Sequence, residues 1–218
     1  MKQQRSTYFD SLILLAVLVV ALWPLVFGMA VMKWDAMDLY LPWKYFITDM
    51  LSQNQLPLWN PFINGGFSQM GDPGTWYPVS WGVAALFGGY SMGSLHFEYL
   101  LHLYLGGLGF YFLLKQFGLA RVSLLSCATG YMLSGVMIGN AQHLGWVVSA
   151  AWLPWVVMYF LRVQKNPSIR SGLQLALVLF LQLSGGYPGM FIVTIYILLG
   201  FFIVESVRQI RAKNYAHY

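Results

Sequence analysis

The sequence predicts an all-α membrane protein: a polytopic helix bundle of about six transmembrane helices with a long outer loop that itself contains interfacial helices. Hydrophobic residues make up 58% of the 218-residue chain and charged residues only 9%, where soluble domains contain about 25% charged residues. Six segments are apolar over roughly the length that a bilayer requires, about 20 residues. The cations gather between these segments on one side. We therefore expect a single transmembrane domain, residues 1–218.

The expected spans are residues 11–32, 93–114, 122–138, 144–161, 172–187 and 189–207. The first follows a basic segment, as a cleaved signal peptide also does. Its apolar core is longer than the usual core of about 7–15 residues, so we expect a retained membrane anchor. The fifth is the shortest, and a partly re-entrant course is an alternative for it.

The cations predict the orientation of these spans. Ten of the twelve lie at the termini or in the connections between spans two and three and between spans four and five, namely Lys2, Arg5, Lys115, Arg121, Arg162, Lys165, Arg170, Arg208, Arg211 and Lys213. Cytoplasmic loops carry such an excess of Lys and Arg. Both termini are therefore expected inside and residues 33–81, 139–143 and 185–189 outside. The net charge of +5 then reflects membrane orientation, and we expect no nucleic-acid partner.

The outer loop, residues 33–81, holds four of the seven acidic residues together with many Trp, Pro, Asn and Gly. Loops longer than about 15 residues usually have a function. Apolar residues at helical spacing, with Pro42 in the first turn, predict an amphipathic helix over residues 39–52 that lies in the membrane interface. Residues 55–74 are rich in turn residues. Residues 77–89 predict a second short helix, interfacial or re-entrant.

Asp35 and Asp38 are the first candidate for chemistry. They follow the first span at spacing i, i+3, which places them on one face if the helix continues through them. A carboxylate near the headgroups is partly desolvated, which favours a general base. The alternative is a solvated pair of acids at a helix end, or acids paired with Lys33 or Lys44. D-x-x-D alone is a weak motif.

Glu98 and His102, at i, i+4 in the second span, are the second candidate. Ionisable groups inside a span usually face a bundle interior or an aqueous cavity, so they predict either a substrate or proton site or a mutually satisfied pair. His143, in an outer turn, is either a phosphate contact or an ordinary interfacial histidine. No P-loop, two-histidine metal spacing or Ser-His-Asp arrangement is present, and the single cysteine excludes a disulfide framework.

Several blocks resemble the YfhO-type bacterial membrane proteins, a family placed among the GT-C glycosyltransferases. The first block is Asp35, then YLPW at residues 40–43, PLWNP at 57–61, two glycines at 65–66 and a Tyr-Pro at 77–78. The others are HLYLGGLGFYFLLK from His102, the segment from Tyr131 to Met158, and LQLSGGYPGM at 181–190. In the last block the family more often has His-Pro where this chain has Tyr187-Pro188. The resemblance extends over nearly the whole chain.

The resemblance implies an enzyme of the bacterial cytoplasmic (inner) membrane that moves a sugar from a polyprenyl-phosphate donor to an acceptor on the outer face. It implies that Asp35 deprotonates the acceptor and that Asp38 orients it. Two carboxylates are compatible with a divalent cation or with none, so the resemblance requires no cofactor. The donor phosphate would meet Lys33, Lys44 or His143, and sugar hydroxyls would meet Trp59, Asn60 and Asn64. The interfacial helix would hold the polyprenyl chain among the membrane lipids.

Family members are longer and contain more spans, so the resemblance covers their N-terminal portion. It leaves open a C-terminal half or a partner membrane subunit. Two other functions also fit the sequence. One is a transporter or flippase that uses Glu98 and His102, and the other is a non-catalytic membrane subunit whose outer loop docks a partner.

Overall fold

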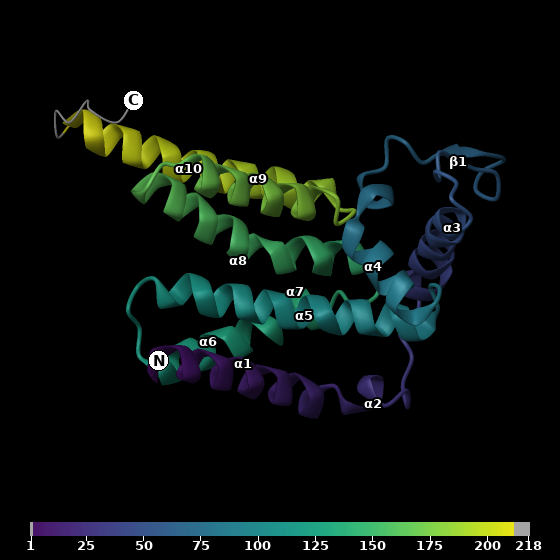
Figure 1. Cartoon of the computed structure of the whole chain (residues 1–218), viewed down its shortest axis with the longest axis horizontal. Coiled ribbons are helices and arrows are strands. Elements are labelled where there is room, and N and C mark those ends of the chain that lie inside the picture. Colours follow the sequence, from purple (N-terminus) through teal and green to yellow (C-terminus); the bar gives the residue numbers. More distant parts are fainter. Residues whose placement is uncertain (1, 212–218) are drawn as a thin grey trace.

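The computed structural model describes residues 2–211, and the side chains of residues 7–211. It is mostly helical, and its long helices lie alongside one another (Figure 1). The start of α1 and the end of α10 lie at one end of this bundle, and the segments between α2 and α5 gather at the opposite end (Figure 1). The elements in chain order are α1 (Lys2–Ala21), α2 (Trp23–Val26), η1 (Ala36–Tyr40), α3 (Leu41–Ser52), β1 (Trp59–Asn60), β2 (Phe67–Ser68), η2 (Pro73–Trp76), α4 (Pro78–Phe87), α5 (Met92–Lys115), α6 (Arg121–Met132), α7 (Gly135–Ile138), α8 (Leu144–Lys165), α9 (Ile169–Leu183) and α10 (Pro188–Arg211).

Four helical stretches in the described part of the chain are long and apolar enough to cross a membrane: Met92–Lys115, Arg121–Ile138, Leu144–Lys165 and Pro188–Arg211. They correspond to four of the six expected spans. The other two expected spans contain shorter apolar helices, Thr7–Ala21 within α1 and Ile169–Leu183 in α9. The prediction of a helical membrane protein is thus supported by helix length and composition.

The first helix does not extend to Met32, and the expectation of one continuous span over residues 11–32 was wrong. Helix α1 ends at Ala21, and α2 is a single turn that contains Pro24 near its start. Pro24 has no N–H to donate to the preceding turn and its ring crowds that turn. A turn follows at Gly28, whose φ of 69° is natural for glycine. As a result Asp35 and Asp38 are not on a continuation of α1.

Helices α5 and α8 form the centre of the bundle. Helix α5 packs against α8, α6 and α1, while α8 packs against α9. Gly106 of α5 faces Ala151 of α8 and Met137 of α7, and a Cβ at Gly106 would lie 3.3 Å from the Ala151 Cα. Small residues allow such close approach where helices cross in a membrane. Helix α10 is much less covered by other helices than α5 or α8. Of its apolar 18-residue stretch, 11% is buried, compared with 50% in α5 and 61% in α8.

Polar side chains join the helices at both ends of the bundle. Near the chain termini, Asp10 of α1 is 1% exposed and accepts hydrogen bonds from Arg121 of α6 and Tyr111 of α5, each at 2.7 Å. Between α8, α9 and α10, the Gln182 amide nitrogen donates to the Ser149 carbonyl at 3.1 Å and to the Thr194 hydroxyl at 2.9 Å. These hydrogen bonds fix the helices in register, since an unpaired polar group inside a bilayer is costly.

The outer segment, residues 33–89, takes its name from the side of the membrane on which the sequence predicts it. It contains helices where the apolar spacing predicts them, α3 and α4, and Pro42 lies in the first turn of α3. Residues 55–74, expected to be irregular, also contain a small hairpin in which β1 pairs antiparallel with β2. This hairpin is the exception to the expected all-α fold within the described residues. The outer segment lies across the ends of the long helices (Figure 1), so it covers one end of the bundle.

Candidate functional site

The site with an accessible carboxylate lies at the outer-segment end of the bundle and is centred on Asp35 and His143. The Asp35 Oδ2 atom lies 3.1 Å from the His143 Nδ1 atom. Asp35 precedes η1, and His143 precedes α8, so the two side chains come from segments 108 positions apart. The Asp35 side chain is 50% exposed and the His143 side chain 31% exposed. The two side chains are therefore in direct contact and also accessible to solvent.

Aromatic rings continue from this pair. The His143 ring lies 5.3 Å from the Trp146 ring, which stacks on the Tyr187 ring with centroids 4.5 Å apart. Tyr187 belongs to the turn before α10, at the position where the resembled family more often has histidine. The three rings form a continuous face that begins at the carboxylate of Asp35.

Tyr40 packs next to this site, with its hydroxyl beside Gly145, and is only 8% exposed. Burial raises the pKa of the Tyr40 phenol, the backbone N–H of Gly145 lowers it, and the nearby charges of Asp35 and Asp72 raise it further. The Tyr40 hydroxyl therefore stays protonated at neutral pH. Glycine at residue 145 leaves space for this contact, since a Cβ there would lie only 3.2 Å from the Tyr40 hydroxyl oxygen and would crowd it.

Asp38 lies in η1, three residues after Asp35, and is exposed. Because η1 is a π-helical turn and α1 has already ended, the expected shared helix face of Asp35 and Asp38 does not form as predicted from α-helical spacing. Lys33 is also exposed, and it lines a cavity of about 380 Å³ together with Leu25, Tyr99 and Gln142.

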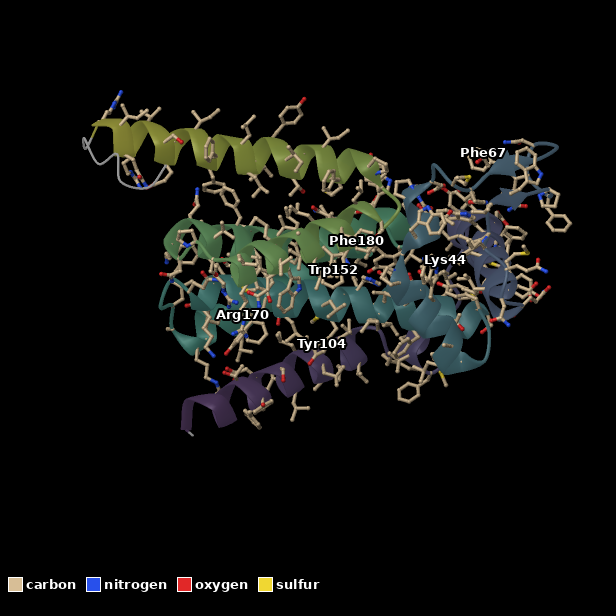
Figure 2. The ribbon with its side chains drawn as sticks, turned by 45° about the horizontal axis from the view of Figure 1, so that its top comes forward. Lys44, Phe67, Tyr104, Trp152, Arg170 and Phe180 are labelled. Atoms are coloured by element: carbon tan, nitrogen blue, oxygen red, sulfur yellow. The ribbon has the colours of Figure 1, made fainter. Side chains whose placement is uncertain are left out.

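Lys44, expected to meet a donor phosphate, is instead buried at 6% exposure. Its Nζ lies 2.8 Å from the Glu98 Oε1 and donates to the Ser80 hydroxyl at 2.5 Å. The same Glu98 accepts hydrogen bonds from Ser80 at 2.9 Å and from Tyr90 at 2.6 Å. Figure 2 shows Lys44 within the crowded side chains of the outer segment. In this arrangement Lys44 is not available to a phosphate.

His102 forms a second buried group one turn further along α5. Its Nδ1 lies 2.6 Å from the Glu98 carbonyl oxygen and its Nε2 lies 2.5 Å from the Tyr77 hydroxyl. The Trp152 indole N–H of α8 donates to the same hydroxyl at 2.8 Å. Burial raises the pKa of Tyr77 well above its ordinary value, so the phenol remains neutral. The Glu98 and His102 side chains are fully buried and hydrogen-bonded. The expected pair is thus satisfied, but by other residues and by the Glu98 backbone carbonyl, since no hydrogen bond joins the carboxylate to the imidazole.

The three candidate sugar contacts lie in the hairpin region. Trp59 is 57% exposed, and Asn64 is exposed at the turn with a φ of 52°. Asn60 is 2% exposed, and its side-chain oxygen accepts a hydrogen bond from the Phe62 N–H at 3.0 Å. Asn60 therefore closes the hairpin, and the expected contact with a sugar does not fit its position.

The sequence assigned no role to five residues that the structure brings to these sites: Tyr40, Asp72, Ser80, Tyr90 and Trp152. A signal existed for the buried pair. An acid inside a span needs a partner, and Lys33 and Lys44 are the two cations of the outer loop. Nothing in the local sequence distinguishes the hydroxyl groups that complete the network.

No protein-family model matches this chain, and the comparisons with curated proteins and with solved structures find no match either. The site is therefore interpreted from its own geometry.

Proposed function

We propose that this chain is a membrane glycosyltransferase that moves a sugar from a polyprenyl-phosphate donor to an acceptor on the outer face of a bacterial cytoplasmic membrane. The observation that carries the proposal is the contact between Asp35 and His143, a half-exposed carboxylate held 3.1 Å from an imidazole. General bases must reach the proton that they remove, and Asp35 is both positioned and open.

In the proposed reaction, Asp35 accepts a proton from an acceptor hydroxyl as that oxygen attacks the anomeric carbon of the donor sugar. The new bond joins the acceptor oxygen to the anomeric carbon, and the bond from this carbon to the phosphate oxygen breaks. Polyprenyl phosphate leaves with the bonding electrons. His143 orients Asp35, and in its protonated form it also offers positive charge to the phosphate. Asp38 is the second acid, exposed nearby.

Lys33 is the cation best placed for the donor phosphate, because Lys44 is buried in an ion pair with Glu98. Lys33 lines the cavity of about 380 Å³ whose other lining residues include Leu22, Leu25 and Val31. An apolar cavity with one cation suits an isoprenoid phosphate, whose chain is apolar and whose head is anionic. The stacked rings of Trp146 and Tyr187 offer an apolar face to a sugar ring.

The arrangement of the charges supports the outer location of this site. In Figure 1 the outer segment lies at the end of the bundle opposite the start of α1 and the end of α10. The cations at the facing ends of α5 and α6 and of α8 and α9 lie at the end of the bundle that holds the start of α1 and the end of α10 (Figure 1), which the positive-inside rule assigns to the cytoplasm. Helices α3 and α4 would then lie in the outer interface.

A transporter that uses Glu98 and His102 has no observation in its favour, since both side chains are closed off and fully bonded. The docking-subunit alternative predicts that changes of exposed aromatic residues matter and that Asp35 does not.

The test is sugar transfer in membranes that lack the native protein, with labelled polyprenyl-phosphate sugars as donors. We expect transfer by the parent chain and a loss of about 10²–10⁴-fold in Asp35→Asn, the range for removal of a general base. Glu205→Gln is the matched control, because it neutralises an acid at the opposite end of the bundle. Equal transfer by the parent and Asp35→Asn, at equal expression, would contradict the proposed base. Transfer by neither would contradict the proposal for this chain.

A further inference from the structure

A second cavity, of about 530 Å³, lies between α3 and α4 and is separate from the Asp35 site. One wall is a single face of α3, formed by Tyr45, Thr48, Asp49 and Ser52 at spacing i, i+3, i+4, i+7. This face carries one acid and three hydroxyl groups. It is therefore the polar side of the amphipathic helix, turned toward a hollow.

The opposite wall explains why the hollow is open. Helix α4 contributes Ala84 and Ala85, and Gly88 follows its end. These residues fill little volume where larger side chains would have met α3. No heavy atom of a neighbouring side chain lies within 4 Å of a Cβ placed at Gly88. The space is thus a consequence of small residues at helical spacing opposite a polar face.

Two of the three hydroxyl groups of the α3 wall, those of Thr48 and Ser52, are already used as donors. The Thr48 hydroxyl donates to the Lys44 carbonyl at 2.8 Å, and the Ser52 hydroxyl donates to the Asp49 carbonyl at 2.7 Å. Their remaining lone pairs can only accept hydrogen bonds. Toward the cavity, these two side chains therefore act as acceptors.

The aromatic donors of the lining are used as well. The Trp81 indole N–H donates to the Thr75 carbonyl at 3.1 Å, and the Tyr90 hydroxyl donates to Glu98 at 2.6 Å. The rings of Trp81 and Tyr90 remain as apolar and π surfaces on the lining. A ligand in this cavity consequently meets acceptors and aromatic faces but few donors.

Asp49 gives the cavity its charge. Its Oδ2 accepts a hydrogen bond from the Gln53 side chain at 2.9 Å, and among the described residues it has no ion-pair partner. No Lys or Arg lines the cavity. An anionic ligand would be repelled, whereas a cation with several N–H groups would pair with Asp49 and lie near aromatic rings, which attract cations.

We propose that this cavity binds the primary ammonium headgroup of an aminophospholipid. A primary ammonium has three donors and one positive charge, which complements one carboxylate and two hydroxyl acceptors. The lipid chains have a place beside it, since Leu86 is 70% exposed and Phe87 48% exposed on the same helix α4. Phe87 also contacts Phe97 of α5 at 5.3 Å between rings. This binding does not depend on the proposed sugar transfer.

The test uses purified protein in mixed micelles that contain equal amounts of phosphatidylethanolamine and phosphatidylcholine, with retained lipid counted by native mass spectrometry. We expect about fivefold preference for phosphatidylethanolamine, the equivalent of a partly exposed ion pair of about 1 kcal/mol. Asp49→Asn should abolish the preference. Ala85→Leu should abolish it by filling the cavity, without any change of charge. Glu205→Gln is the matched control, because it removes a negative charge outside the cavity.

Equal retention of the two lipids by the parent protein would overturn the proposal, and so would a preference that survives both Asp49→Asn and Ala85→Leu. Soluble competitors distinguish the source of the ligand. Displacement of the retained lipid by ethanolamine but not by glucose is the expected result. Displacement by glucose and glucosamine alike would show a site that recognises sugar hydroxyls, and would also overturn the proposal. Elution as a monodisperse species confirms that each variant is folded before it is compared.

Discussion

The Lys44 ammonium lies 2.8 Å from the Glu98 carboxylate at a point where both side chains are almost completely buried. Lys44 belongs to α3 of the outer segment and Glu98 to the span α5. The pair therefore ties the outer segment to the bundle. Ser80 of α4 bonds to both partners, so three helices meet at one charge pair.

This arrangement predicts that replacing one member of the pair lowers the free energy of unfolding strongly, and that replacing both members together lowers it less than the two single changes combined. Lys44→Met leaves Glu98 buried without its counter-charge and should lower the free energy of unfolding by about 3–5 kcal/mol. Glu98→Gln should act similarly through the stranded Lys44. The double variant Lys44→Met/Glu98→Gln should cost clearly less than the sum of the two. Thermal or denaturant unfolding in a fixed detergent measures all three.

The exposed pair Glu205–Arg208, at 3.3 Å and with the Arg208 side chain 75% exposed, is the matched control for this cycle. Solvent screens such a pair, so neutralising both residues should show no measurable coupling. Strictly additive effects of the Lys44 and Glu98 changes would contradict the buried-pair interpretation.

Asp10 predicts a second stability effect, at the end of the bundle that holds the termini. It accepts hydrogen bonds from Arg121 and Tyr111 and joins α1 to α5 and α6. Asp10→Ala should destabilise the protein by about 1–3 kcal/mol, because the buried Tyr111 hydroxyl then loses the carboxylate that accepts its hydrogen bond. Combining it with Tyr111→Phe should recover part of the loss. Unfolding temperatures equal to those of the parent would show that α1 is held by apolar packing alone.

Asp72 predicts a pH-dependent effect on stability. Burial raises the pKa of Asp72, while the Gly74 N–H and the Lys44 charge lower it in part. The folded-state pKa of Asp72 lies above the ordinary value of 3.8. The charged carboxylate therefore destabilises the folded state increasingly as the pH rises above 3.8. The penalty disappears when the pH falls below 3.8, since the residue is then protonated in both states.

Asp72→Asn should therefore gain stability relative to the parent as the pH is raised from about 3 to 7. The asparagine oxygen can still accept the hydrogen bond that Asp72 receives from Gly74 at 2.9 Å. The measurement is the difference in unfolding temperature between the two proteins at each pH. A difference that is constant with pH, or that moves in the opposite direction, would refute the inferred pKa shift.

The proposed orientation predicts which positions react with a membrane-impermeant maleimide. Phe62 is 84% exposed in the outer segment, so Phe62→Cys in a Cys127→Ala background should be labelled in sealed right-side-out vesicles. Arg170→Cys, in the first turn of α9, should be labelled only after the vesicles are opened. Reversed labelling of the two positions would place the Asp35 site on the cytoplasmic side.

Much of the fold follows from the sequence because it depends on local patterns. Apolar length predicts the four long helical stretches, and apolar spacing with Pro42 predicts α3. The error over residues 22–32 has a local cause that was readable, since Pro24 and Gly28 interrupt an apolar segment that hydrophobicity alone treats as continuous.

The candidate site was only partly predictable. From composition and charge, the sequence predicts that residues 33–81 lie on the side opposite most cations and that Asp35 and His143 lie on this same side. They did not show that these two residues touch, or that Lys44 turns inward to Glu98 while Lys33 stays exposed. The partner of each charged side chain depends on how α3 and α4 lie across the bundle.

The sequence by itself determined that this is a helical membrane protein with an acidic, aromatic segment separate from ten of its twelve cations. These properties arise from hydrophobic length and charge position, which act residue by residue. Only the tertiary structure decided which acid is buried and which is open. Glu98 is enclosed because three helices supply its partners, and Asp35 remains accessible because it meets a single imidazole at the edge of the bundle. Burial and pairing are properties of the packed elements, so no local pattern could assign them.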